Sequence, residues 1–573
     1  MRGSCAILTR LDVQMEEGFW WGTGGGCKKP KVGDTPSFGH HNHEAMPDEI
    51  FVHVKQPMRR IISVLPDKVW PNVQRNPLVW ALPLQALLLL WNLDLLDPWG
   101  DEWFTIAAVA EPVGHVVSEV AANIHPPLYF VLLHYWIQLP GILSPVASMR
   151  AMSAVWALVA TAVIYMLWLR RERSQFQAKF LALWAVSPCM LLLARMARSY
   201  SMQVALASVA IYSAPRWAEQ PRNWKWLLAF VGSSTALLYT HYLSGLAVAG
   251  GVCVTFLIQK RFKLVAVFVT LLAVLYSPWV LTLISVLHRL TQLDMPYLYE
   301  GGSVIFDQII RLGYLLVSLS FGETFSAVSL IISVALAPVV IYYLWRAVET
   351  RATWIPIVLA ASAIAWIGVS RLEQLVFMPN QFLFVLPFFL LLLVRQMNPR
   401  VFVAFFVLYA GADYAYFTKS GFLVKPYAAP YQEMAEVILG KSRGRNAIVA
   451  VDPYGAFSEP LLTRLGGSVP VIILNDGASA RKVLEAAQSG RSGASSILLW
   501  RRTSDVSPGS FITKLEQDLS IGREVSHRDF VAYSLPERWA LLLLRGPAQP
   551  EYYYRLSEFR MANSDMSPSW SPK

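Results

Sequence analysis

The chain has 573 residues, of which 55% are hydrophobic and only 15% are charged. This balance lies outside the usual range for soluble domains and indicates a multi-pass α-helical membrane protein. The formal net charge of +11 does not indicate a nucleic-acid partner, because the Lys and Arg residues fall in short loops between apolar segments, where they orient a chain in the bilayer. The four cysteines are scattered, so neither a disulfide framework nor a cysteine metal site is expected.

The first 75 residues are polar, glycine-rich and basic. The glycine run at 24–26 lacks the Gly-Lys-Ser/Thr ending of a phosphate-binding loop. The near-adjacent histidines at 40–43 stand in a segment with no apolar core, which favours solvated side chains over a metal site. We therefore expect residues 1–75 to form a disordered basic tail in the cytoplasm.

The first membrane span is predicted at about 78–96, close to the roughly 20 apolar residues that cross the hydrocarbon. Four basic residues precede it, so the positive-inside rule puts its N-terminal side in the cytoplasm: Arg59, Arg60, Lys68 and Arg75. Asp101 and Glu102 then emerge on the outer face. They lie in a first outer loop over 97–125, within a predicted transmembrane domain of residues 76–420.

Further apolar segments follow, the last at 401–417, and we count roughly thirteen by the length criterion. Thirteen crossings would put several basic loops outside, which the positive-inside rule disfavours. The count falls to eleven if 126–143 and 304–321 are re-entrant or interfacial. Either odd number leaves residues beyond about 420 on the outer, periplasmic side of the membrane. With eleven crossings, His241, Asn380 and Gln381 face outward together with Asp101.

From residue 431 the pattern changes to short apolar strands that alternate with amphipathic helices. This pattern predicts an extracytoplasmic α/β domain over 430–547 with a largely parallel sheet, whose last strand we expect at 541–544. No Gly-x-Gly-x-x-Gly follows its first strand, so we expect no nucleotide site there. Residues 548–573 are polar and are expected to form a flexible tail.

Charged side chains beside membrane spans are functional candidates, because they cost free energy unless they are paired or face a wet cavity. Asp101 and Glu102 suit a general base or a divalent metal site, and the alternative is a solvated pair in a loop. Arg195 and Arg198 are three residues apart, on one side of a helix, and guanidinium groups fit phosphate oxygens bidentately. Their alternative role is to anchor the end of the helix at the interface.

Two further motifs place polar groups at the ends of apolar segments. His125 precedes two prolines that suit the first turn of a helix, although a lone histidine there is more often structural than catalytic. His241 and Tyr242 end another apolar run, and an aromatic belt at the membrane interface is the alternative explanation for the tyrosine.

Taken in order, these motifs resemble the bacterial branch of the GT-C membrane glycosyltransferases, which contains protein O-mannosyltransferases and the lipid A aminoarabinose transferase. The resemblance covers roughly residues 77 to 545. Its carriers are Asp101-Glu102-Trp103-Phe104-Thr105, His125-Pro126-Pro127-Leu128-Tyr129, Arg150, Ser187-Pro188, Ala194-Arg195-Met196-Ala197-Arg198-Ser199-Tyr200-Ser201, Tyr239-Thr240-His241-Tyr242 and Ser277-Pro278-Trp279.

The resemblance implies transfer of a sugar from a polyprenyl-phosphate carrier to an acceptor on the outer face, with inversion at the anomeric carbon. Asp101 would be the base, and Glu102 would assist it or help to hold a divalent metal. The donor phosphate and lipid would be bound by Arg195, Arg198, Tyr200 and Arg150. The sugar and acceptor pocket would be lined by His125, His241, Tyr242, Asn380 and Gln381.

One position departs from the family pattern. Many relatives carry Arg-Tyr before the late Leu-Pro-Phe run, whereas this chain has Asn380-Gln381. An amide forms hydrogen bonds to a sugar or phosphate but brings no charge, and Arg371 is a candidate to supply one.

The expected partners are a polyprenyl-phosphate sugar, membrane lipids and an acceptor that is lipid A, a polysaccharide, a glycolipid or a protein. The expected location is the bacterial inner membrane. A flippase or transporter of lipid-linked saccharides is the alternative, although the halves of the chain show no evident repeat. A third hypothesis is a sensor or assembly scaffold in which Asp101 and Glu102 are inert.

Overall fold

The computed structural model describes residues 76–123, 125–141, 143–290, 304–324, 327–348, 352–371, 379–422, 424–443, 447–452, 458–488, 496–502, 511–521, 523–532 and 552–561. The predicted N-terminal tail over 1–75 and the strand expected at 541–544 lie outside these residues, as does the side chain of Arg371.

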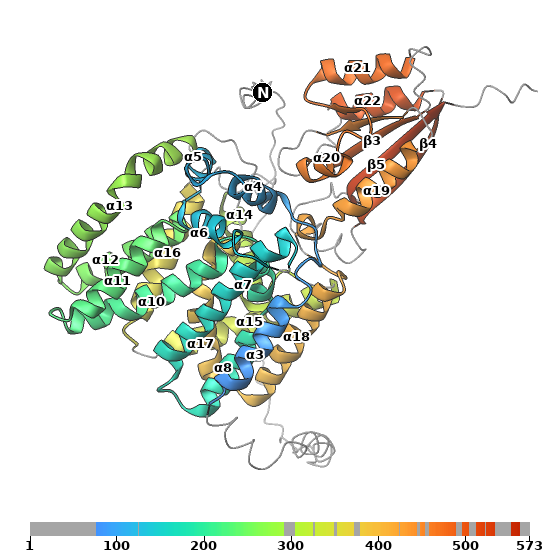
Figure 1. Cartoon of the computed structure of the whole chain (residues 1–573). Helices are drawn as coiled ribbons and strands as arrows, with labels where there is room; N and C mark the ends of the chain where they lie inside the picture. The colour runs from blue at the N-terminus through green and yellow to red at the C-terminus, as the bar shows by residue number, and fades with distance from the viewer. Residues whose placement is uncertain are drawn as a thin grey trace, which may run out of the picture. The chain divides into compact units, whose positions relative to one another are not determined.

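The first part of the chain is a bundle of helices (Figure 1). In chain order they are α3 (Leu78–Leu90), α4 (Gly100–Val109), α5 (Val113–Ala122), α6 (Leu128–Trp136), α7 (Pro145–Ile164) with a π-helical turn η2 (Tyr165–Leu169), α8 (Ser174–Ala185), α9 (Pro188–Ala194), α10 (Tyr200–Glu219), α11 (Trp224–Leu238), α12 (Tyr242–Ile258), α13 (Phe262–Leu290), α14 (Val304–Phe321), α15 (Ala327–Val348), α16 (Ile355–Arg371), the 3₁₀ turn η3 (Pro379–Val385), α17 (Leu386–Gln396), α18 (Pro399–Phe417) and the 3₁₀ turn η4 (Lys425–Ala428).

Helix α10 lies at the centre of this bundle. It packs against α7 and α11, and almost all of its side chains are buried. Helices α12 and α16 approach closely, since a Cβ placed on Gly251 would lie 2.7 Å from backbone atoms of Ala361 and Ile357. Small residues at such contacts let membrane helices pack backbone to backbone.

Helix α13 lies at the edge of the bundle (Figure 1) and is apolar on most of its surface. Only 11% of the residues in its most apolar 18-residue stretch are buried, and Leu281 is 80% exposed. An apolar helix with so little protein around it is explained by contact with lipid. Within the described residues, four helices are long and apolar enough to cross a membrane, or five if the bent pair α8 and α9 is one span. The protein is therefore a helical membrane protein, and the count of 11 to 13 segments stays a prediction.

Three short helices, α4, α5 and α6, connect α3 to α7. Helices α4 and α5 lie in the predicted outer loop, and α6 lies in the apolar segment expected at 126–143. Pro112 precedes α5 and Pro127 precedes α6, positions where the missing proline N–H costs no hydrogen bond. Helix α6 has nine residues, too few to cross the hydrocarbon. The motif residues Asp101 and Glu102 lie in the first turn of α4.

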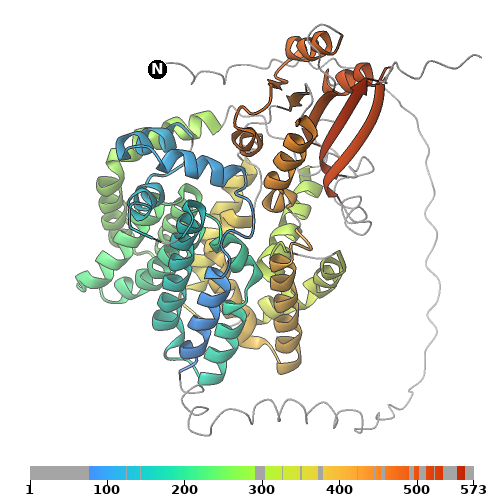
Figure 2. The ribbon, with the colours of Figure 1, turned by 45° about the vertical axis from the view of Figure 1, so that its right-hand side comes forward.

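The C-terminal part contains one five-stranded sheet in the order β2-β1-β3-β5-β4. Its strands are β1 (Ala447–Val451), β2 (Val471–Ile473), β3 (Ser496–Arg502), β4 (Arg523–Ala532) and β5 (Tyr552–Met561), the longer of which lie side by side in Figure 2. Helices α19 (Tyr431–Ser442) and α20 (Glu459–Leu465) pack on one face. Helices α21 (Gly477–Gln488) and α22 (Phe511–Ser520) pack on the other.

Two expectations for this region are wrong. The sheet is mixed, because β5 pairs antiparallel with both β3 and β4. The segment expected to be a flexible tail contains β5, whose Tyr554, Leu556 and Phe559 are buried. The strand was not predicted because its sequence contains several charged residues. In the fold these charges are paired: Arg555 lies 2.6 Å from Asp529, and Lys441 bonds to Glu558.

Candidate active site

The candidate site lies where the segment between α9 and α10 meets the first turn of α4. Arg195 ends α9 and Ser199 precedes α10, so residues 195–199 form an irregular connection between two buried helices. The backbone N–H of Ala197 donates to Glu102 Oε1 at 2.8 Å, and Arg198 Nη1 donates to the Asp101 carbonyl at 3.2 Å. These contacts bring two motifs together that are about a hundred residues apart in the chain.

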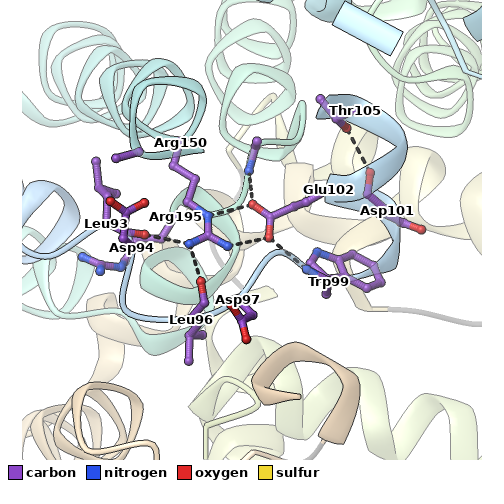
Figure 3. A network of polar contacts seen from close by, with 12 residues as sticks. Leu93, Asp94, Leu96, Asp97, Trp99, Asp101, Glu102, Thr105, Arg150 and Arg195 are labelled. Atoms are coloured by element: carbon purple, nitrogen blue, oxygen red, sulfur yellow. Dashed lines mark hydrogen bonds and ion pairs between the residues drawn. The ribbon is translucent and has the colours of Figure 1, made fainter. Parts of the chain in front are cut away.

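Glu102 is buried and its carboxylate is fully engaged (Figure 3). Arg150 donates from Nε to Oε1 and from Nη2 to Oε2, each at 2.8 Å. Backbone N–H groups of Ala197 and Trp99 donate to the same two oxygens, at 2.8 and 3.4 Å. Four donors occupy the lone-pair positions of a carboxylate. Glu102 therefore has no free oxygen for a proton or a metal, which differs from the role expected from the sequence.

Besides Arg198, two other arginines were expected to bind the lipid phosphate, Arg150 and Arg195. Both instead donate their hydrogen bonds to groups of the protein. The remaining nitrogen of Arg150, Nη1, donates to the carbonyls of Leu93 and Leu96, at 2.7 and 2.8 Å. Arg195, which is 2% exposed, donates to the Tyr416 hydroxyl and to four backbone carbonyls: Leu88, Leu89, Trp91 and Asn92. Such carbonyls lack partners at a helix C-terminus. Arg195 thus caps α3.

Asp101 has a different environment from its neighbour. Its side chain is 41% exposed, and its Oδ2 lies 3.6 Å from Arg198 Nη2. In Figure 3 it points away from the Glu102–Arg150 pair. Desolvation raises the pKa of Asp101 above its usual value, the Arg198 guanidinium lowers it, and Glu102 raises it again. Asp101 is therefore a partly exposed carboxylate whose pKa is raised, so it binds a proton more readily than an ordinary aspartate.

Arg198 connects Asp101 to the start of α10 and to η3. Besides Asp101, its guanidinium bonds to Thr105 Oγ1 at 3.2 Å and to the Tyr200 hydroxyl. Asn380 Nδ2 donates to the same Tyr200 hydroxyl at 2.9 Å. The structure thus brings together three of the residues expected at the donor and pocket, and Gln381 follows Asn380 in η3.

His125 lies beside this cluster, and its ring contacts the rings of Phe104 and Phe130 at centroid distances of 5.0 and 5.6 Å. Burial lowers the pKa of His125 well below its usual range, and the nearby Arg198 and His241 lower it further. The ring is therefore neutral at physiological pH. Tyr242, which was expected to line the pocket, forms hydrogen bonds within the protein: its hydroxyl donates to the His125 carbonyl at 3.3 Å and accepts from Trp279 Nε1 at 2.7 Å.

Two polar residues near the site were missed in the sequence, Gln203 and Ser244. Gln203 lies in α10, and its Nε2 donates to the Asn380 carbonyl at 3.1 Å. Ser244 lies in the first turn of α12, and its hydroxyl donates to Gln203 Oε1 at 2.5 Å. Both are buried. The available signal was their polarity within largely apolar helices, which in membrane proteins marks functional positions.

A divalent metal does not fit these residues. Asp101 is the one carboxylate of the motif with free oxygens, because Glu102 is saturated by its four donors. Within the part of the chain that the structure describes, no group of three or more His, Cys, Asp or Glu side chains is placed to hold a metal ion.

The polar site and the apolar helices define a helical membrane protein with a candidate active site formed by α4, α10, η3 and the loop before α12. No family model and no curated protein matches the chain. Two crystal structures of ArnT from Cupriavidus metallidurans are similar to it. The apo structure has a TM-score of 0.45 and 13% identity, covering 86% of this chain and 98% of ArnT. The structure bound to undecaprenyl phosphate has a TM-score of 0.43 and 15% identity, covering 87% and 99%. ArnT is an aminoarabinose transferase of the GT-C class that the motifs resemble.

Proposed function

We propose that the protein is a membrane glycosyltransferase that moves a sugar from a polyprenyl-phosphate carrier to a hydroxyl acceptor, with inversion at the anomeric carbon. The observation that carries the proposal is the pair formed by Asp101 and Arg198, a partly exposed carboxylate 3.6 Å from a buried guanidinium. The acceptor class is lipid A, a polysaccharide, a glycolipid or a protein. The site and the α/β domain face the periplasm of the bacterial inner membrane in this proposal.

Asp101 acts as the general base. It takes the proton of the acceptor hydroxyl as the hydroxyl oxygen attacks the anomeric carbon. The bond from that carbon to the phosphate oxygen breaks, and its electron pair leaves with the polyprenyl phosphate. One base is sufficient because the phosphate departs as an anion that needs no proton.

Arg198 supplies the positive charge for the departing phosphate. Its contact with Asp101 Oδ2 is an ion pair at 3.6 Å, longer than a hydrogen bond, so a phosphate oxygen is able to compete for Nη2. The hydroxyl of Tyr200 and the amide of Asn380 lie on the same side of the site. Fixed donors and cations in a poorly solvated site stabilise developing negative charge. The uncharged Asn380 is thus compensated by Arg198.

Glu102, Arg150 and Arg195 position this machinery and take no part in the chemistry. The Glu102–Arg150 pair fixes the first turn of α4 against the carbonyls that follow α3, and Ala197 attaches the α9–α10 connection to it. The carboxylate of Asp101 is held in place by the same turn. Small displacements of a base or of a cation lose much of the gain from correct orientation.

The test uses the purified full chain in lipid vesicles supplied with radiolabelled polyprenyl-phosphate sugars and candidate acceptors. Wild type is compared with Asp101→Asn. Asp94→Asn is the matched control, because Asp94 is an exposed carboxylate of the preceding loop that accepts from Ser144 at 2.7 Å. Transfer by wild type and by Asp94→Asn, but not by Asp101→Asn, supports the proposal.

Equal transfer by all three proteins would show that Asp101 is not the base. Absence of transfer by every protein, together with protein-dependent movement of the lipid-linked sugar across the vesicle membrane, would replace the enzyme with a transporter.

A further inference from the structure

A chain of hydrogen bonds runs from η3 through α10 to His241, which precedes α12. It begins at the Asn380 carbonyl, which accepts from Gln203 Nε2 at 3.1 Å. Gln203 Oε1 lies 2.5 Å from Ser244 Oγ, and Ser244 Oγ lies 2.6 Å from His241 Nδ1. The three side chains are buried or half-buried. Each of the short contacts needs one hydrogen atom between its two heavy atoms.

The Asn380 carbonyl determines how the amide of Gln203 is oriented. A carbonyl only accepts hydrogen bonds, so the Gln203 atom that faces it is the NH₂ group. The other end of the amide is then the oxygen Oε1, which also only accepts. The hydrogen in the contact of 2.5 Å therefore comes from the Ser244 hydroxyl.

The same reasoning assigns the proton of His241. Ser244 has a single hydroxyl hydrogen, and Gln203 uses it. The contact of 2.6 Å between Ser244 Oγ and His241 Nδ1 then requires the hydrogen to come from the ring. The backbone N–H of Ser244 competes for a lone pair on Nδ1, but at 3.3 Å it is the weaker interaction. Nδ1 thus carries the proton, and Nε2 carries the lone pair.

Nε2 is available as an acceptor. No residue in the described part of the chain forms a hydrogen bond with it, and His241 lies in the loop between α11 and α12, outside the helices. Burial lowers the pKa of His241, and the neighbouring Arg198 lowers it further, so the ring is neutral at physiological pH. A neutral imidazole in this tautomer is able to accept a hydrogen bond from a hydroxyl group and unable to donate one at Nε2.

We propose that Gln203 and Ser244 are positioning residues that hold His241 in the Nδ1–H tautomer, so that Nε2 accepts a hydrogen bond from a sugar hydroxyl. The inference rests on the proposed glycosyltransferase function for the identity of the ligand. The tautomer itself follows from the geometry and is measured without any substrate. A site built to accept from a hydroxyl discriminates against an analogue that lacks this group.

The first test is nitrogen-15 NMR of the full chain in lipid nanodiscs with labelled histidine. The signal of His241 is identified by its loss in His241→Gln. We expect the Nδ1–H tautomer in wild type, a shift toward the Nε2–H tautomer in Ser244→Ala, and retention of Nδ1–H in Ser244→Thr, which keeps a hydroxyl group. An Nε2–H tautomer in the wild-type protein would overturn the inference, whatever the protein's activity is.

The second test is kinetic and uses donors with the complete sugar and with single hydroxyl groups removed. Ser244→Ala is expected to lower kcat/KM about tenfold for the complete sugar, the usual size of one neutral hydrogen bond, and to leave one deoxy donor unaffected. Gln203→Leu, which removes the acceptor of the Ser244 hydroxyl, is expected to behave in the same way. Ser244→Thr should restore the discrimination.

Ser208→Ala is the control, because Ser208 lies buried in α10 and its hydroxyl has no partner in the described structure. Equal losses for every donor in Ser244→Ala would indicate a structural role and would overturn the proposal. If even wild type transfers no sugar, the glycosyltransferase proposal fails, and the NMR result still decides the tautomer.

Discussion

Asp101 and Glu102 are neighbours in the chain, but their carboxylates differ completely in what surrounds them. Glu102 is 1% exposed and receives four hydrogen bonds, two of them from Arg150 at 2.8 Å. The Asp101 side chain is 41% exposed and has one ion pair, with Arg198 at 3.6 Å. The first turn of α4 thus presents one buried, fully hydrogen-bonded carboxylate and one partly exposed carboxylate.

Asp101→Asn is expected to reduce kcat by about 10² to 10⁴, the range lost when a general base is removed. The amide is nearly the same size, so thermal unfolding should be unchanged. Sugar transfer from a radiolabelled donor measures the first effect, and a melting curve in detergent measures the second. A mutant that is inactive because it is unfolded would not support the role of the base.

Glu102→Gln is expected to destabilise the protein by about 3 to 5 kcal/mol, because it leaves the buried Arg150 without its counter-ion. Denaturant unfolding measures this change. The double variant with Arg150→Met should recover part of the loss, since both buried charges are then absent. A Glu102→Gln protein of normal stability but without activity would instead give Glu102 a chemical role.

Arg195 and Arg198 are expected to respond differently to the same change. Arg195→Lys cannot reach all the carbonyls at the end of α3, so its melting temperature should fall. Arg198→Lys keeps the charge but loses the planar group of donors, so KM for the polyprenyl-phosphate donor should rise about tenfold with little change in stability. Titration of the donor and melting curves on both variants separate the two cases. The same change in melting temperature and in KM for both variants would contradict a capping role for Arg195 and a phosphate-binding role for Arg198.

The pH dependence of transfer should follow the ionisation of Asp101. A base works in its deprotonated form, so the rate is expected to fall as the pH drops through the pKa of Asp101, which desolvation raises above its usual value. The pKa of His125 is lowered by burial, so this ring remains neutral across the same range. His125→Gln should therefore change the rate but leave the acidic limb of the profile at the same pH.

A chelator is expected to leave the transfer rate unchanged, because Glu102 has no free oxygen with which to share a metal with Asp101. The measurement is transfer with and without EDTA, followed by addition of Mg²⁺ or Mn²⁺. Loss of activity with EDTA and recovery with a metal would contradict this expectation.

The membrane class and the main candidate residues were visible in the sequence, because they depend on local properties. Apolar runs of sufficient length predict membrane helices in any fold. A charged residue at the end of such a run is a functional candidate before its partners are known. This reasoning selected Asp101 and Arg198, which the structure places 3.6 Å apart.

The tertiary structure decided which of these candidates are free to act. Nothing in the sequence assigns different roles to Arg195 and Arg198. In the structure Arg195 faces the end of α3 and donates its hydrogen bonds to the carbonyls there. The segment that forms β5 was predicted to be a polar tail because the sequence does not show that its Arg555 and Glu558 pair with Asp529 of β4 and Lys441 of α19. The sequence determined which groups are present and which segments are apolar. Their hydrogen-bond partners depend on contacts between residues that are distant in the sequence, such as Glu102 and Ala197, and only the folded chain creates these contacts.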